Sequence, residues 1–276
     1  MRHQTRWTSQ KIGKYLQLTE PLTYQYVQPL PELQYTEVDA ENIQIDFDNL
    51  EAYNWIDLPY NSYWGKPDTN FILRVRFTIP KALTENEQQT ALFLPIGSAG
   101  NFVHPETLVY IDGQSIAAID RYHQEIILPD SYFDEQSHEV IMHGWTGNGH
   151  RDGEHGSFLL SQCALVQIHQ PTRDLVAITR TALGSIDFLD NNAPAKHHLL
   201  NALDTAYRHL DTREPLTDRY YASVEKTLRT LRAEIEKKGD PLNVTISATG
   251  HAHIDVAWLW TLGQTRNKAR RTFHTV

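Results

Sequence analysis

The residues whose types and spacing could do chemistry gather in one segment, Gly250-His251-Ala252-His253-Ile254-Asp255, near the end of the 276-residue sequence. The β-branched run NVTISATG (243–250) precedes this segment and predicts a strand. Because residues i and i+2 of a strand point to one side, we expect His251, His253 and Asp255 to converge. Imidazole and carboxylate together suit a divalent metal ion such as zinc. The alternative is two surface or helix-start histidines, with Asp255 as a helix N-cap.

Two tryptophans follow at once, in Asp255-Val256-Ala257-Trp258-Leu259-Trp260. Large indole faces beside a polar site are typical of the surfaces on which sugar rings stack. Tryptophan is nevertheless more often a core residue, since its ring buries a large apolar area. We expect Trp260 in the core, and for Trp258 both interpretations stay open.

The elements that must position this segment begin with a β-rich region. FILRVRFTIP (71–80) alternates in the period of a half-buried strand. Asp112-Gly113 lies between two strand-like runs and predicts a hairpin, because both turn positions need a positive φ. Further short apolar runs follow at 91–97, 125–130, 138–147 and 163–171. Together these runs predict an antiparallel β-sandwich over about 20–180. We expect one N-terminal helix before it, at 4–18.

A helical region comes next. From Asn192, with Pro194 in the first turn, apolar residues repeat at helical spacing as far as Leu210. A second series starts after Pro215 and ends in a cationic turn before Gly239. We therefore predict helices near 193–211 and 216–238, which connect the β-rich region to the C-terminal region.

The C-terminal region is too short to be a domain. One parallel strand at 243–250 and one helix over Thr261–Val276 cannot make a sheet, because a parallel strand is buried by neighbours on both sides. The chain is expected to be part of a longer protein. The predicted organisation is a β-sandwich domain at 1–185, a helical connector at 186–240, and the first strand–helix unit of an α/β domain at 241–276.

Composition excludes several classes of protein. The 25 Lys and Arg residues against 34 Asp and Glu give a net charge of −9, which argues against a dedicated nucleic-acid binder. No apolar run approaches the roughly 18 residues of a membrane span, and the N-terminus shows no secretory signal. The single cysteine, Cys163, excludes an internal disulfide and a cysteine-based metal cluster. We expect an acidic, soluble, cytoplasmic protein.

The segment GHAHIDVAWLWTLGQTRNKARRTF (250–273) resembles the start of the catalytic domain of glycoside hydrolase family 38, the class II α-mannosidases, and most of all its cytosolic/vacuolar subgroup. YWGKPDTNFILRVRFTIP (63–80) and LVYIDGQSIAAIDRYHQEIILP (108–129) resemble the N-terminal sandwich of that subgroup. The resemblance covers nearly the whole chain. It implies a β/α-barrel catalytic domain that begins near residue 241.

The resemblance also implies roles for individual residues. His253 and Asp255 match ligands of zinc, or of cobalt in the cytosolic subgroup, and Trp258 matches the floor of the mannose subsite. His251 matches no ligand and is expected to orient the site through hydrogen bonds. The implied activity is retaining hydrolysis of α-linked mannose in oligosaccharides through a covalent mannosyl-enzyme. The family's nucleophile, its acid/base carboxylate and two further metal ligands match nothing within 1–276, so this chain alone is expected to be inactive.

Two other functions stay open. The first is an amidohydrolase-type metallohydrolase, in which His251 and His253 would both bind a binuclear metal centre and Asp255 need not be a ligand. The sequence around Trp258 and the long N-terminal sandwich argue against this alternative. A non-enzymatic alternative makes residues 1–180 a carbohydrate-binding or scaffold module. The expected binding partner is an α-mannoside oligosaccharide. The sequence leaves open whether the chain also forms a homo-oligomer.

Three weaker candidates are interpreted as structural. The histidines of HGWTGNGHRDGEHG, namely His143, His150 and His155, favour a solvated loop over a metal site. Asp120-Arg121-Tyr122-His123 is expected to form a hydrogen-bonded turn. Cys163 lies in an apolar run and is expected in the core.

Overall fold

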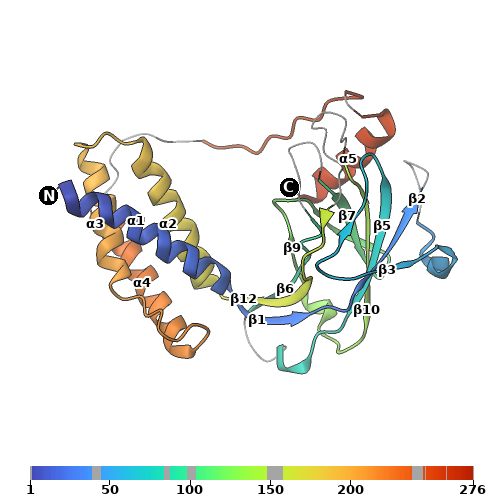
Figure 1. Ribbon diagram of the computed structural model, residues 1–276, viewed down its shortest axis with the longest axis horizontal. Coiled ribbons are helices and arrows are strands. Elements are labelled where there is room, and N and C mark those ends of the chain that lie inside the picture. The colour runs from blue at the N-terminus through green and yellow to red at the C-terminus, as the bar shows by residue number, and fades with distance from the viewer. Residues whose placement is uncertain are drawn as a thin grey trace. The chain divides into compact units, whose positions relative to one another are not determined.

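The structure is a computed structural model that describes residues 2–38, 45–83, 88–97, 104–147, 158–237, 245, 247–258 and 260–275, with side chains from Trp7 onward. The chain divides into two compact units. One is helical and combines Met1–Tyr26 with Gln167–Ser247; the other is β-rich and combines Val27–Val166 with Ala248–Val276 (Figure 1).

The helical unit is built from four helices, α1 (Arg2–Thr19), α2 (Gln170–Phe188), α3 (Pro194–Tyr207) and α4 (Asp218–Glu236). Its core is a cluster of apolar and tyrosine side chains that includes Ile12, Leu175, Leu203 and Tyr220, each fully buried. Side-chain hydrogen bonds cap the N-termini of α2 and α4. His169 Nδ1 accepts the N–H of Thr172 at 3.3 Å for α2, and Thr217 Oγ1 accepts the N–H of Tyr220 at 3.3 Å for α4.

The structure confirms the helices predicted at 4–18, 193–211 and 216–238, but α2 was not predicted. Strand structure ends at Ile168, so the sandwich expected to about residue 180 ends earlier, and the boundary predicted at 185 falls inside α2. The sequence does hold a signal for this helix. Its buried residues Leu175, Thr179, Ala182 and Ile186 recur at steps of three and four.

The strands of the described residues form three sheets. The six-stranded sheet has the order β3-β2-β5-β10-β7-β8, the four-stranded sheet has the order β1-β12-β6-β9, and β11 and β4 form a two-stranded sheet. Pairing is antiparallel between β5 and β10, β10 and β7, β7 and β8, and β6 and β9. The predicted β-rich, antiparallel region is therefore confirmed. The strands are β1 (Tyr24–Pro29), β2 (Leu33–Val38), β3 (Ile56–Leu58), β4 (Tyr63–Trp64), β5 (Asn70–Phe77), β6 (Gln89–Phe93), β7 (Glu106–Ile111), β8 (Gln114–Ile119), β9 (Glu125–Ile127), β10 (His138–Trp145), β11 (Phe158–Leu159) and β12 (Ala164–Ile168).

The hairpin predicted at Asp112-Gly113 joins β7 to β8. Asp112 has φ +49° and Gly113 has φ +77°, so both turn residues adopt the left-handed conformation that a tight hairpin needs. Ile111 pairs with Gln114 across the turn.

Strand β5 differs from its predicted half-buried state, because the second face, which carries Ile72, Arg74 and Arg76, is covered as far as Arg74. Ile72 lies on the face expected to meet solvent, yet it is fully buried in a second cluster with Val38, Leu50 and Ile141. The short 3₁₀ helix Phe47–Ala52 contributes Leu50 and covers this face. Arg74, also expected to be exposed, is buried and paired with carboxylates.

The C-terminal segment departs most from expectation. Residues 245 and 247–250 of the predicted strand are not in a strand, while 243, 244 and 246 lie outside the described residues. The described part of the chain offers this segment no parallel neighbour, and a lone strand has no hydrogen-bonding partner. The helix expected over Thr261–Val276 is present as α5 (Leu262–Thr275), and it packs against β7 and β8. In the described residues, no helix has both the length and the apolar character of a membrane span.

Candidate functional site

The segment from His251 to Asp255 is irregular; residues 251–253 are exposed to solvent, and Ile254 and Asp255 are half-buried. His253 Nε2 lies 3.2 Å from Asp255 Oδ1. The rings of His251 and His253 are nearly parallel, with centroids 6.5 Å apart and planes 15° apart. The structure thus brings His253 and Asp255 together without the strand on which the sequence argument relied.

The donor pair fits half of a zinc site. Two ligand atoms at tetrahedral positions about 2.0–2.1 Å from zinc lie roughly 3.3 Å apart, and the His253–Asp255 distance of 3.2 Å is close to that value. Within the described residues, no group of three or more His, Cys, Asp or Glu side chains could hold a metal ion. His253 and Asp255 can therefore supply two ligands, and any further ligand must come from elsewhere.

Hydrogen bonds from the start of α5 hold the main chain at Asp255. Trp260 Nε1 donates to the Asp255 carbonyl oxygen at 3.3 Å. Thr265 Oγ1 accepts the N–H of Ala257 at 3.1 Å and lies 3.5 Å from the same carbonyl. Ala257 has φ +53°, a left-handed conformation that turns the chain sharply from the candidate ligands into the helix.

The two tryptophans lie edge to face, with ring centroids 5.6 Å apart. The side chain of Trp258 is 49% exposed, so part of its indole surface faces solvent, as a sugar-stacking residue requires. Trp260, predicted to be a core residue, is only partly buried. The ammonium group of Lys268 lies 5.8 Å from its ring centroid, and this contact with a charged neighbour takes the place of an apolar core.

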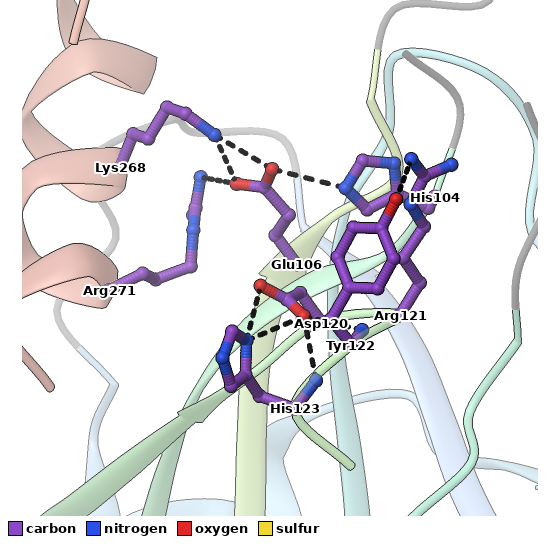
Figure 2. Close-up of polar contacts among 8 residues, drawn as sticks. All are labelled: His104, Glu106, Asp120, Arg121, Tyr122, His123, Lys268 and Arg271. Atoms are coloured by element: carbon purple, nitrogen blue, oxygen red, sulfur yellow. Dashed lines mark hydrogen bonds and ion pairs between the residues drawn. The ribbon is translucent and has the colours of Figure 1, made fainter. Parts of the chain in front are cut away.

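A charged cluster that the sequence did not reveal anchors α5 to the β-rich unit (Figure 2). Lys268 Nζ donates to both carboxylate oxygens of Glu106, at 2.8 and 3.0 Å, and Arg271 Nη2 donates to Oε2 at 3.2 Å. His104 Nε2 lies 3.3 Å from Oε1. Burial raises the pKa of Glu106, but His104, Arg271 and Lys268 outweigh it and hold that pKa well below its usual range. Glu106 is therefore an ionised, largely buried carboxylate.

The weaker candidates lie in different environments. His143 is in β10 rather than in a loop, and burial, followed by the positive charges of Arg271 and Arg270, lowers its pKa to about 4. His150 and His155 lie outside the described residues. Cys163 is fully buried, as expected.

The turn expected at 120–123 is confirmed. The Asp120 carboxylate accepts the N–H groups of Tyr122 and His123 at 2.7 and 2.9 Å, and it lies 3.0 Å from His123 Nδ1 (Figure 2). These bonds are internal to the turn, so they account for Asp120 structurally.

Comparison with solved structures gives weak likenesses. An apo structure of β-glucuronidase from Ruminococcus gnavus is 14% identical over 52% of this chain and 29% of that chain, with a TM-score of 0.34. A structure of the CBM51-2 and INT domains of Clostridium perfringens ZmpB, in complex with GlcNAc, is 10% identical over 76% of this chain and 41% of that chain, with a TM-score of 0.20. At such scores these likenesses carry no argument about fold or function.

No curated protein matches the chain. A family model does match part of it, the one described as "Glycosyl hydrolases family 38 N-terminal domain", over residues 243–276. The matched stretch contains His251, His253, Asp255, Trp258 and the whole of α5. The match covers this C-terminal stretch alone, and for that stretch it supports a relationship to glycoside hydrolase family 38.

Proposed function

We propose that this chain is part of a metal-dependent retaining α-mannosidase that releases α-linked mannose from oligosaccharides. The observation that carries the proposal is the coincidence of two features in one short stretch. The family 38 match falls on residues 243–276, and within it His253 Nε2 and Asp255 Oδ1 lie 3.2 Å apart, on side chains that are 76% and 47% exposed. The proposal includes that family's architecture, in which a β-sandwich precedes a β/α-barrel.

The roles of this chain's own residues follow from their chemistry. His253 and Asp255 would hold zinc or cobalt, and the bound ion would supply positive charge to the hydroxyl oxygens of the sugar. The half-exposed ring of Trp258 offers a flat apolar surface for a sugar ring. His251, with its ring nearly parallel to that of His253, would orient the neighbouring ligand.

Retaining hydrolysis needs two carboxyl groups about 5–5.5 Å apart, one as nucleophile and one as acid/base. The proposal assigns neither role to a residue of this chain. We accordingly expect the 276-residue chain to show no glycosidase activity by itself. A test of activity therefore uses a polypeptide that also supplies those two carboxyl groups.

The test combines metal content with hydrolysis of a p-nitrophenyl α-mannoside. His253→Ala and Asp255→Ala should each release the metal and abolish hydrolysis, because each removes a ligand. His251→Ala should keep the metal and lose activity by about 10–100-fold, the usual cost of losing a group that orients a ligand. His197→Ala, which removes an exposed histidine from α3, is the matched control and should change neither quantity.

Two outcomes would contradict the proposal in different ways. If His251→Ala strips the metal while Asp255→Ala keeps it, the site is of the binuclear amidohydrolase type. If the wild-type enzyme cleaves another glycoside and leaves the α-mannoside intact, the mannosidase assignment is wrong while the glycosidase assignment stands.

A further inference from the structure

Helix α5 presents polar side chains to the β-rich unit. Its buried residues are Gly263, Gln264, Thr265 and Arg271, whereas its large apolar side chains are exposed, Leu262 by 49% and Phe273 by 83%. An ordinary amphipathic helix docks the other way round, with its apolar stripe toward the core. Hydrophobic burial therefore does not explain why α5 lies where it does.

Polar contacts take the place of an apolar stripe along the helix. Near the start of α5, Gln264 Nε2 donates to Asn70 Oδ1 at 2.6 Å. Near its end, His274 Nε2 lies 3.2 Å from Ser115 Oγ. Between them, the cluster around Glu106 joins the middle of the helix to the first residue of β7 (Figure 2).

The Glu106 cluster is largely buried. The side chains of Glu106 and Arg271 are 16% and 8% exposed, and that of Lys268 is 31% exposed. A buried charge without its partner is costly, so a displaced α5 would leave Glu106 or Arg271 unpaired. Such a pair contributes little net stability, but it selects one helix position over its alternatives.

The position of α5 determines the position of the candidate ligands. Lys268, which is paired with Glu106, lies over the ring of Trp260, and Trp260 Nε1 donates to the Asp255 carbonyl. Thr265, on the buried side of α5, binds the N–H of Ala257. A continuous series of contacts thus runs from the first residue of β7 to the main chain of Asp255.

We propose that Glu106 is a positioning residue: its ion pairs with Lys268 and Arg271 fix α5 on β7 and β8, and thereby fix the His253–Asp255 segment. The role in docking α5 stands independently, whereas the role in metal binding rests on the proposed function.

The test uses the 276-residue chain and the variant Glu106→Gln. Hydrogen exchange should show at least about tenfold lower protection of residues 262–275, with protection of β5 and β10 unchanged, because the variant frees the helix without removing the sheet. In a titration with Zn²⁺ alone, the same variant should bind at least about tenfold more weakly. The matched control is Glu37→Gln, which breaks the exposed Lys66–Glu37 pair at 2.6 Å in the same unit and should change neither measurement.

A second variant keeps the test decisive if Glu106→Gln disturbs the whole unit. Lys268→Met removes one ion pair from the more exposed partner and leaves Glu106 with Arg271. It should lower the protection of 262–275 and the Zn²⁺ affinity by a smaller factor, with β5 and β10 unaffected. Two results would overturn the proposal. In the first, both variants protect 262–275 as well as the wild type does. In the second, protection is lost but the Zn²⁺ affinity stays at the wild-type value. Because the described part of the chain supplies only two ligands, a wild-type chain that binds no measurable Zn²⁺ is still consistent with the proposed function. The exchange measurement then decides by itself whether Glu106 docks α5, and unchanged protection of 262–275 in both variants would overturn the proposal.

Discussion

Asp112 and Glu139 are joined by two reciprocal hydrogen bonds. The N–H of Asp112 donates to the Glu139 carbonyl at 3.0 Å, and the N–H of Glu139 donates to Asp112 Oδ1 at 2.9 Å. The other carboxylate oxygen of Asp112 lies 2.7 Å from Nδ1 of His138, whose Nε2 lies 3.0 Å from Asp134 Oδ1. The β7–β8 hairpin is therefore tied to the start of β10 through a histidine held between two carboxylates.

This arrangement predicts a pH-dependent stability. Only an imidazolium can donate from both ring nitrogens, so folding favours the charged form of His138. Burial lowers the pKa of His138, but the bonds to Asp112 and Asp134 outweigh it and raise that pKa above its ordinary value of 6.5. A raised folded-state pKa means that the stabilisation is fully present below pH 6.5 and is lost as the pH rises through the folded-state value.

Urea unfolding between about pH 5.5 and 8.5 measures the effect. His138→Gln should reduce the free energy of unfolding by about 1.5–3 kcal/mol at low pH and by less at high pH, since hydrogen bonds to charged groups are worth about that much. His197→Gln, at an exposed position, is the control. Parallel pH profiles for the wild type and His138→Gln would show that His138 is not the source.

The features that the sequence predicts well are the local ones. Asp112-Gly113 forms its hairpin because the φ values of two adjacent residues decide the turn, and Pro194 marks the start of α3 for a similar reason. The anchoring of α5 depends instead on Lys268 and Glu106, which are 162 residues apart in the sequence. No spacing rule connects such a pair.

The proximity of two candidate ligands could be predicted for the same reason. The His253–Asp255 proximity follows from an i, i+2 spacing and survives the absence of the expected strand. The coverage of Ile72 by the segment around Leu50 depends on tertiary packing, which strand periodicity does not report. Helix α2 was missed although its period was visible, because its first residues, Gln170 and Pro171, closely follow the apolar strand and were counted in the strand-like run at 163–171.

Gly144 in β10 is predicted to tolerate no side chain. A Cβ atom there would lie 2.6 Å from the Glu106 carbonyl oxygen, from Phe71 Cζ and from Thr107 Cγ2, so strand backbone and two buried side chains would have to move. Gly144→Ala should cost about 1–3 kcal/mol of stability, the usual cost of overpacking.

Gly184→Ala in α2 is the opposite case, because a Cβ there meets nothing within 4 Å. It should add roughly 0.5–1 kcal/mol, since alanine loses less entropy than glycine in a helix. Urea midpoints of the two variants should move in opposite directions, and equal losses would contradict both arguments.

Cys163 is predicted to be chemically inert in the folded protein. Burial raises the pKa of its thiol to about 12, against a smaller opposing effect of Tyr60, and the residue has no exposed surface. Labelling with a thiol reagent at about pH 8 should be at least about 100-fold slower than in urea, because only the thiolate reacts and the sulfur is covered. A Ser185→Cys variant, which adds a thiol on the exposed side of α2, supplies the fast-reacting comparison. Similar rates for the two thiols in the folded protein would contradict the buried placement.

Arg74 is predicted to be irreplaceable by lysine. Its guanidinium donates from Nε to Glu139 and from Nη2 to Glu51, both at 2.7 Å, and lies 5.5 Å from the ring centroid of Trp55. A lysine ammonium cannot reproduce this planar arrangement of two carboxylates and an aromatic face. Because the Arg74 side chain is only 7% exposed, Arg74→Lys should lower the free energy of unfolding by about 1–3 kcal/mol through donors and acceptors left unpaired.

The matched control for Arg74 is its neighbour on the same strand and the same face. Arg76 also binds Glu139, at 3.0 Å, but its side chain is 60% exposed. Arg76→Lys should therefore stay within about 0.5 kcal/mol of the wild type, as exposed ion pairs usually do. Urea unfolding followed by tryptophan fluorescence reports both variants, since Trp55 lies against Arg74. Equal stabilities of Arg74→Lys and Arg76→Lys would mean that burial of the Arg74 pair does not matter to the fold, and the cluster around Ile72 would then hold β5 without it.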